Sequence, residues 1–226
     1  MLIDSEEALA AGVTALASRD PAMAALVAAG IRPPLRKRDP GFASLIGIVV
    51  SQQVSTASAA AIWARLRSVL PAMDPETVRA ASDGDLRAGG LSRPKMAAIR
   101  AIAAAALDGS LPLEQLGEMD VERAHSLLTA VKGVGPWTAD VYLLFCLGHP
   151  DAFPAGDLAV QEAARLALGL PARPDARALG GIAERWRPWR GVAAGLLWAY
   201  YARVKARDGA PMPSADAALD ADGPSY

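Results

Sequence analysis

One carboxylate stands at the point where the sequence predicts that a helix begins. Asp157 follows a Phe-Pro-Ala-Gly loop and precedes an amphipathic run that starts at Leu158. As an N-cap, this side chain would accept hydrogen bonds from the backbone amides of residues 159 or 160. An ionised carboxylate held in this way can also stabilise a positive charge that develops beside it. Taken by themselves, the residues leave two roles open for Asp157, a plain helix cap and a catalytic group.

A second group with chemical capacity is a glycine-rich turn between two helical runs. Gly133, Val134 and Gly135 form a turn too short for regular structure, and Pro136 suits the first position of the next helix. Two helices joined in this way make a helix-hairpin-helix. Backbone amides left bare in the turn, together with a helix N-terminus, suit a phosphate. Thr138 would bond either a phosphate or its own helix backbone.

The elements that position these groups are all expected to be helices. Apolar residues recur at helical spacing along the chain, and we find neither an alternating strand pattern nor an internal repeat. The fold is therefore predicted to be all-α. We expect helices in residues 5–29 with a break at Asp20-Pro21, in 42–50 and 62–70, after the caps Asp74, Ser92 and Asp120, from Pro136, and in 158–168, 176–187 and 189–206.

Composition excludes several classes of protein. The chain has 226 residues, of which 52% are hydrophobic and 21% are charged, a balance typical of globular proteins. The single cysteine, Cys146, excludes a disulfide framework and a four-cysteine iron–sulfur cluster. We find no apolar run of membrane-spanning length and no basic signal-peptide start, so no membrane partner and a cytoplasmic location are expected.

The formal net charge of −1 argues against a strongly basic nucleic-acid binder, but the charges are unevenly distributed. Residues 208–226 contain four aspartates and no Lys or Arg, and this segment is predicted to be a disordered tail. Basic residues gather instead in 32–38, 93–100 and 185–190. Each of these clusters is either part of a positive binding face or an ordinary solvated surface.

Five segments together resemble the helix-hairpin-helix DNA glycosylases of base-excision repair, and within them the 3-methyladenine DNA glycosylase II branch. They occur in family order between about residue 40 and residue 206. They are Ile48-Val-Val-Ser-Gln-Gln-Val-Ser55, Gly90-Leu-Ser-Arg-Pro-Lys95, Val131-Lys-Gly-Val-Gly-Pro-Trp-Thr-Ala-Asp140, Phe153-Pro-Ala-Gly-Asp157-Leu and Glu184-Arg-Trp-Arg-Pro-Trp-Arg190.

The resemblance implies two helical lobes, with DNA bound as a duplex between them. It implies that residues 1–39 form helices that pack with the C-terminal lobe, and that 40–150 form a lobe with the hairpin at about 121–148. Residues 151–207 would then form the C-terminal lobe that carries Asp157. Larger relatives have an extra N-terminal β domain, which the 39 residues before the matched region are too few to hold.

The resemblance also assigns roles to side chains. Asp157 falls on the family's catalytic aspartate, which stabilises the sugar cation formed when a damaged base leaves. Trp137 stands where bifunctional relatives carry a nucleophilic lysine, so no lyase activity is expected. Trp137 and Trp198 would instead be aromatic residues of the base pocket, although core packing explains Trp198 nearly as well.

Further residues are implied to contact DNA or a cation. Gln52 and Gln53 stand where the family plugs the gap left by a flipped base, and a solvated helix end is the alternative. Backbone carbonyls of Thr129, Val131 and Val134 match those that hold a monovalent cation, Na⁺ or K⁺, in the family. No other cofactor is expected. Aspartate in place of Gly133 or Gly135 is expected to weaken DNA binding while the fold survives.

The resulting hypothesis is a monomeric, monofunctional glycosylase, located in the cytoplasm and associated with the nucleoid through DNA. It would flip alkylated purines such as 3-methyladenine and 7-methylguanine from double-stranded DNA and excise them hydrolytically. Two alternatives remain open at this point. One is a glycosylase for another damaged base. The other is a non-catalytic helix-hairpin-helix protein that binds DNA and uses Asp157 only as a cap.

Overall fold

The computed structural model describes residues 2–207, and all regular secondary structure in this range is helical. The all-α prediction is therefore confirmed. The tail predicted for residues 208–226 lies outside the described residues. Among the described helices, none is long and apolar enough to cross a lipid bilayer. The chain divides into two compact units, and the division falls after Tyr142, inside helix α9 (Pro136–Phe145).

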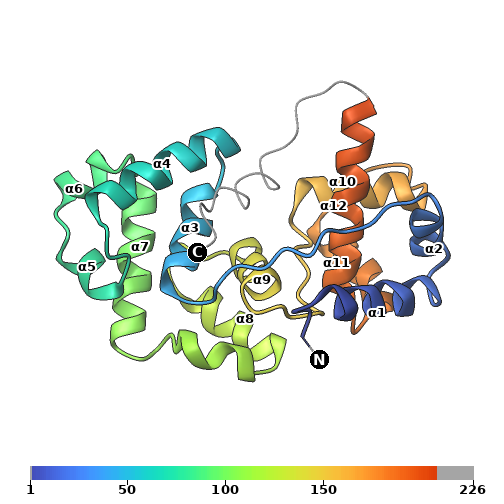
Figure 1. The fold of residues 1–226 in the computed structure, drawn as a ribbon, viewed down its shortest axis with the longest axis horizontal. Coiled ribbons are helices and arrows are strands. Elements are labelled where there is room, and N and C mark those ends of the chain that lie inside the picture. The colour runs from blue at the N-terminus through green and yellow to red at the C-terminus, as the bar shows by residue number, and fades with distance from the viewer. Residues whose placement is uncertain (1, 208–226) are drawn as a thin grey trace. The chain divides into compact units, whose positions relative to one another are not determined.

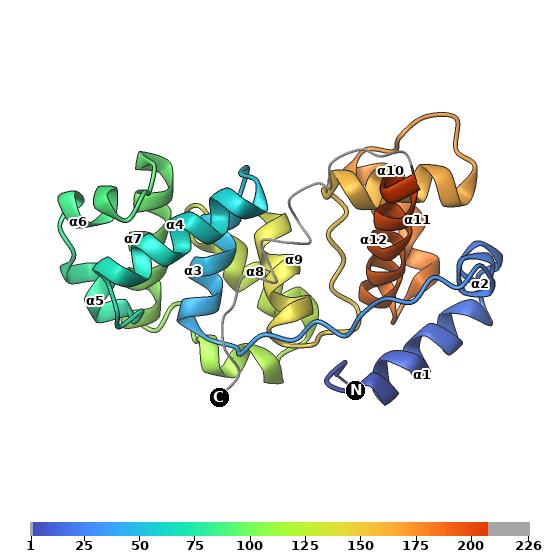
Figure 2. The same cartoon turned by 45° about the horizontal axis from the view of Figure 1, so that its top comes forward.

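The first unit combines residues 2–38 with residues 143–207, the two outer parts of the described chain. Helices α10 and α12 pack side by side (Figure 1), and α1 and α2 pack against α12 (Figure 2). Its core includes Leu16, Met23 and Leu197, each at most 1% exposed. Its elements are α1 (Glu6–Ala17), α2 (Pro21–Ala28), α10 (Leu158–Leu168), α11 (Ala176–Ala183), the 3-10 helix η2 (Glu184–Trp186) and α12 (Arg190–Arg207).

Asp20 ties the N-terminal segment of this unit to its C-terminal segment. One carboxylate oxygen caps α2 by accepting from the amides of Ala22 and Met23, at 2.9 and 3.1 Å. The other accepts from the indole N–H of Trp186 at 2.8 Å and lies 2.9 Å from Nε of Arg185. The predicted break at Asp20-Pro21 is confirmed, and its acid does more than end a helix.

The second unit is the continuous segment 39–142 within the described chain. Its centre is α3 (Phe42–Ser51), whose Leu45, Ile46 and Ile48 are fully buried, and α3 packs against α4 and α7. Helix α7 also packs along α5 (Figure 1). The remaining elements are α4 (Thr56–Val69), α5 (Pro75–Ala80), α6 (Asp83–Ala88), α7 (Arg93–Leu107), the 3-10 helix η1 (Leu113–Glu118) and α8 (Val121–Ala130), followed by most of α9.

Local capping explains where several of these helices begin. Asp74 and Asp120 accept hydrogen bonds from the amides of Thr77 and Arg123, at 2.7 and 2.8 Å, as their sequence positions predict. Ser92 occupies the N-cap of α7, but its side chain makes no capping hydrogen bond. The short elements α6 and η1 were not predicted, because six residues are too few for a clear helical period.

Candidate active site

Asp157 is the N-cap of α10, and its carboxylate is buried at 6% exposure. Its Oδ1 accepts hydrogen bonds from the amides of Ala159 and Val160, at 2.9 and 3.0 Å. The capping role predicted from the sequence is therefore confirmed. The next residue, Leu158, is 63% exposed, which is unusual for a large apolar side chain. The helix thus presents a fixed acid beside an exposed apolar group.

Trp198 lies against this carboxylate. Its indole Nε1 donates to Oδ1 of Asp157 at 3.2 Å, so α12 supplies a third donor to the oxygen that caps α10. The ring also packs against Phe145, with centroids 5.5 Å apart and planes inclined by 32°. Trp198 is 5% exposed. The structure therefore brings Trp198 and Asp157 together, and a role for Trp198 in binding a base stays a prediction.

The loop before Asp157 is held from within. The amide of Asp157 donates to the carbonyl of Pro154 at 2.9 Å, and Nε2 of Gln161 donates to the carbonyl of Ala155 at 2.8 Å. Phe153 packs edge-on against Trp186, with ring centroids 5.8 Å apart. Sequence reasoning missed Gln161. The sequence signal is a polar residue one helical turn after the acid, in a largely apolar run, and the structure shows it to be buried.

The basic cluster at 185–190 turns out to be paired within the first unit. Asp151, 6% exposed, accepts from Nη1 of Arg187 at 2.6 Å and from Nη2 of Arg190 at 2.9 Å. The same two arginines also pair with Glu184, at 2.9 and 3.0 Å. These guanidinium groups hold the segment before α12 against the loop before Asp157. The cluster is therefore paired with acids of its own unit, and a contribution to a positive binding face stays a prediction.

The glycine-rich turn between α8 and α9 forms the predicted hairpin in the second unit. Gly133 has a φ of +91°, and a Cβ there would lie 2.3 Å from Cβ of Ala98 on α7. Aspartate at Gly133 would therefore strain the turn and displace it from α7, so the structure does not support the expectation that the fold survives unchanged at this position. Gly135 has open space around it, so the expectation stands for that position.

The amides of this turn are not all available. The N–H of Val134 donates to the carbonyl of Val131 at 3.0 Å and closes the turn, so the expectation of three bare amides is wrong for Val134. No hydrogen bond within residues 2–207 occupies the amides of Gly133 and Gly135. Trp137 follows in the first turn of α9 and is half-buried. The turn therefore offers two glycine amides and a helix N-terminus.

Gln52 reaches this hairpin from the end of α3. Its Nε2 donates to the hydroxyl of Thr138 at 2.7 Å and lies 3.4 Å from the carbonyl oxygen of Gly133. Thr138 is only 1% exposed, so its hydroxyl faces a protein partner. Gln53, the next residue, is exposed and has a φ of +56°. The structure thus brings Gln52, Gly133 and Thr138 together, and contact of any of them with DNA remains a prediction.

His125 links the two helices of the hairpin. Its Nε2 lies 3.6 Å from Oδ1 of Asp140, which places α8 beside α9. Half-burial lowers the pKa of His125 below its ordinary 6.5, opposed by a hydrogen bond to the backbone of Pro136 and by the carboxylate of Glu122. The imidazole is therefore mainly neutral at pH 7.

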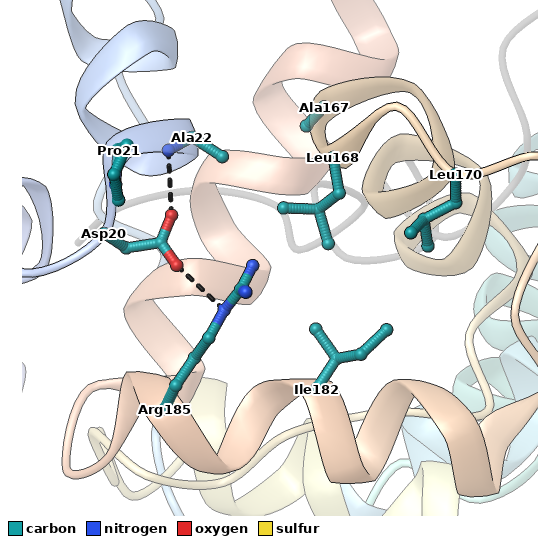
Figure 3. Close-up of a pocket in the computed structure, with 8 residues that line it drawn as sticks. All are labelled: Asp20, Pro21, Ala22, Ala167, Leu168, Leu170, Ile182 and Arg185. Atoms are coloured by element: carbon teal, nitrogen blue, oxygen red, sulfur yellow. Dashed lines mark hydrogen bonds and ion pairs between the residues drawn. The ribbon is translucent and has the colours of Figure 1, made fainter.

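An open pocket lies at the opposite end of α10 from Asp157 (Figure 3). Ala167 is ten positions along the helix from Asp157, a rise of about 15 Å. The carboxylate of Asp20 at its edge is already bonded to the α2 amides, Trp186 and Arg185. This pocket is therefore separate from the carboxylate site. It is lined by Asp20, Pro21, Ala22, Ala167, Leu168, Leu170, Ile182 and Arg185.

Comparison with known proteins assigns this arrangement to a family. The profile described as HhH-GPD superfamily base excision DNA repair protein matches residues 46–188, which is more than half of the chain. The chain therefore belongs to the HhH-GPD superfamily. The matched range contains both the hairpin and the capped carboxylate of Asp157.

Individual relatives agree with this membership. A Mycobacterium tuberculosis protein named "Probable bifunctional transcriptional activator/DNA repair enzyme AlkA" is 39% identical over 194 residues, which are 79% of this chain but only 37% of that protein. "DNA-3-methyladenine glycosylase 1" of Schizosaccharomyces pombe is 32% identical over 170 residues, 73% of each chain. The solved Schizosaccharomyces pombe 3-methyladenine DNA glycosylase Mag1 in complex with abasic DNA has a TM-score of 0.73 at 30% identity, covering 83% of this chain and 94% of that one.

Proposed function

We propose that this chain is a DNA glycosylase that hydrolytically excises alkylated purines, such as 3-methyladenine and 7-methylguanine, from double-stranded DNA. The observation that carries the proposal is the buried carboxylate of Asp157, fixed by two helix amides and by the indole of Trp198. Membership of the HhH-GPD superfamily and the relatives named as 3-methyladenine glycosylases support it. The fold is that of a protein solved with abasic DNA.

The chemistry follows from the position of one negative charge. When the bond between C1′ and the base nitrogen breaks, its electron pair leaves with the base and positive charge develops on the sugar. A preorganised carboxylate lowers the energy of that cation without having to reorient. Water then adds to C1′ and loses a proton, which leaves an abasic site. A purine alkylated at N3 or N7 carries a positive charge, so it departs as a neutral base.

The test is single-turnover release of 3-methyladenine from methylated duplex DNA by the wild type and by Asp157→Asn. Asparagine still caps a helix and barely changes the volume, so the fold and DNA affinity should persist. The rate should fall by about 10²–10³, as when a preorganised electrostatic group is lost. A variant that keeps more than about a tenth of the wild-type rate would remove Asp157 from this role.

Asp175→Asn provides a matched control. Asp175 is the exposed N-cap of α11 and accepts from the amide of Ala178 at 2.7 Å. The same substitution there changes a helix cap in the same unit without touching the carboxylate site. Its rate of base release should equal that of the wild type. No base release by the wild-type protein itself would favour a non-catalytic DNA-binding protein.

The proposal includes the absence of lyase activity. Trp137 stands at the position where bifunctional members of this superfamily carry the lysine that attacks the sugar. Lys132 lies on the other side of the turn. Borohydride should therefore trap no covalent adduct on DNA that contains 3-methyladenine. An adduct that forms with the wild type and disappears in Lys132→Ala would contradict the monofunctional assignment.

A monovalent cation at the hairpin is a further part of the proposal. Thr129 is near the end of α8, where carbonyls lack an intrahelical partner. The carbonyl of Val131 accepts one amide hydrogen bond and keeps a second lone pair. With the carbonyl of Val134, these neutral oxygens fit Na⁺ or K⁺, and within residues 2–207 no cluster of His, Cys, Asp or Glu suits a multivalent ion. When bound, the cation would place positive charge beside a phosphate.

A further inference from the structure

The turn after α3 is held by contacts from two other parts of the second unit. On one side, Nζ of Lys95, on α7, donates to the carbonyl of Val50. On the other side, Nε2 of Gln52 donates to the hydroxyl of Thr138, 86 residues away, and approaches the carbonyl of Gly133. These contacts fix the backbone immediately before Gln53.

Gln53 needs such support because of its backbone conformation. Its φ of +56° lies in the left-handed region, and it is the one non-glycine residue with positive φ among residues 2–207. For an L-residue with a β-carbon, this conformation is unfavourable because the Cβ lies too close to the carbonyl oxygen that follows it. It persists only where the surroundings determine it. Helix α3 ends at Ser51, the backbone becomes extended at Gln52 with a ψ of 131°, and Gln53 follows with its side chain exposed.

Lys95 also holds the turn after α3, although its ammonium group is partly desolvated there. It is partly buried, and this burial lowers the pKa of its ammonium group. The carbonyl of Val50 is among the last four of α3, which have no partner within the helix. The ammonium therefore satisfies a carbonyl at the end of the helix, where a positive charge is favoured.

We propose that Gln52 is a positioning residue that locks the Gln53 turn to the phosphate-binding hairpin. Thr138 then acts as the acceptor in this lock and not as a phosphate ligand. The same rigid unit would grip the DNA backbone and hold Gln53 ready to fill the gap in the duplex when a base leaves. This inference rests on the proposed function, because it requires that the protein extrudes a base from DNA.

The experiment uses the full chain, four single variants and the double variant Gln52→Ala/Thr138→Val. Gln52→Ala removes the donor, Thr138→Val removes the acceptor at nearly constant volume, and Thr138→Ser keeps a hydroxyl. Gln115→Ala is the matched control, because Gln115 is an exposed glutamine of the same unit. Base extrusion is followed by the fluorescence of 2-aminopurine placed beside the target base, an alkylated purine analogue that resists excision, in duplex DNA. Affinity for undamaged duplex and the melting temperature are measured in parallel.

Gln52→Ala and Thr138→Val should each lower the extrusion equilibrium by about three- to tenfold, the effect of one hydrogen bond. The double variant should be no worse than either single variant, because both remove the same contact. Thr138→Ser should restore extrusion, and Gln115→Ala should not change it. Additive losses, or an extrusion signal that is unchanged in both single variants, would overturn the proposal. An equal loss of affinity for undamaged DNA in Gln52→Ala would make Gln52 a DNA ligand instead.

A measurement without DNA separates this inference from the proposed function. In the free protein, hydrogen exchange in residues 49–55 should speed up in Gln52→Ala and Thr138→Val but not in Thr138→Ser. Unchanged exchange in both would show that no lock exists, whatever the enzyme does. If wild type released no methylated base while exchange changed as expected, the proposed function would fail and the lock would remain.

Discussion

In the proposed mechanism, Asp157 combines a structural task, the capping of α10, with a chemical one. The amides of Ala159 and Val160 need an acceptor at the start of α10, and the carboxylate satisfies them. The same contacts remove its rotational freedom, so its charge is already oriented before a substrate arrives. In a site of this kind, preorganisation carries no separate cost, because the helix requires the cap in any case.

Trp198 donates a hydrogen bond to Asp157 that the capping of α10 does not require. Replacement by Phe would keep most of the ring that packs against Phe145 but remove the donor to Asp157. Loss of a hydrogen bond to a charged group should lower the free energy of unfolding by about 1.5–3 kcal/mol. We also expect base release to slow by about tenfold, because the carboxylate loses a restraint on its orientation, a change of about 1.4 kcal/mol in the barrier. Chemical denaturation and single-turnover kinetics measure the two effects.

Trp186→Phe is the control for that experiment. Trp186 is also a buried tryptophan of the first unit, and its indole donates to Asp20 at 2.8 Å. This substitution should lower stability by a similar amount while leaving the rate of base release unchanged. Equal slowing of base release in Trp186→Phe and Trp198→Phe would mean that a general loosening of the unit, and not the contact with Asp157, explains the effect.

Single residues also mark the limit of what the sequence predicts. The caps Asp74, Asp120 and Asp157 were predictable because each bonds amides two or three positions along the chain. The bond from Gln52 to Thr138 joins residues 86 positions apart, and that from Trp198 to Asp157 joins residues 41 apart. No local pattern records such a pairing, because it depends on how helices pack. Both partners of each pair were singled out, yet their contact was not.

At the scale of the elements, the hairpin turn between α8 and α9 contains one glycine that another residue cannot replace without strain. In the Gly133→Ala variant, the residue would have to keep a positive φ. Its Cβ would also lie only 2.3 Å from the Cβ of Ala98. Overpacking and left-handed strain should together lower the free energy of unfolding by about 2–4 kcal/mol. At Gly135, nothing lies within 4 Å of an added Cβ, so alanine should change stability by less than about 0.5 kcal/mol. Thermal melting of the two variants compares them directly.

Because a Cβ added at Gly135 meets no neighbouring group, substitutions there can test phosphate binding without disturbing the fold. Gly135→Asp should keep the wild-type melting temperature and lose affinity for duplex DNA of any sequence, because its charge repels a phosphate at the turn. Gly135→Asn, which is close in size and uncharged, is the matched control. If the aspartate variant bound DNA as tightly as the asparagine variant, the turn would not be a phosphate site.

The bounds of most other helices were predicted to within a few residues, and one helix ends earlier than expected. The helix expected over 176–187 ends at Ala183 and continues as the 3-10 helix η2. There Glu184 turns back to pair with Arg187 and Arg190. This helical run ends where Arg187, with a ψ of 142°, precedes Pro188, because a proline disfavours the helical conformation of the residue before it. The hydrophobic period fixes which face is buried more reliably than where a helix stops.

At the scale of the whole molecule, a net charge of −1 does not show which cations are already engaged by acids of the protein. Arg187 and Arg190 are paired with Asp151, and Arg100 is paired with Asp83 at 2.9 Å. We therefore expect these three arginines to contribute less to phosphate binding than the unpaired charges of the same chain would. For about three neutralised phosphates, a fourfold rise in salt should lower affinity by about 40-fold. Fluorescence anisotropy across a salt series measures the slope, and a flat response would contradict phosphate-led binding.

The first unit is built from two segments that are far apart in the sequence, and this affects how the protein folds during synthesis. Residues 2–38 belong with residues 143–207, so Leu16 and Met23 find their partners only after the whole second unit has been synthesised. At about 5–20 residues per second, the ribosome takes roughly 5–20 seconds to produce the intervening segment. Residues 39–142 are continuous in sequence and can fold during that interval. Until α12 emerges from the ribosome, the apolar faces of α1 and α2 that pack against it stay exposed. We expect chaperones to bind the nascent chain during this time.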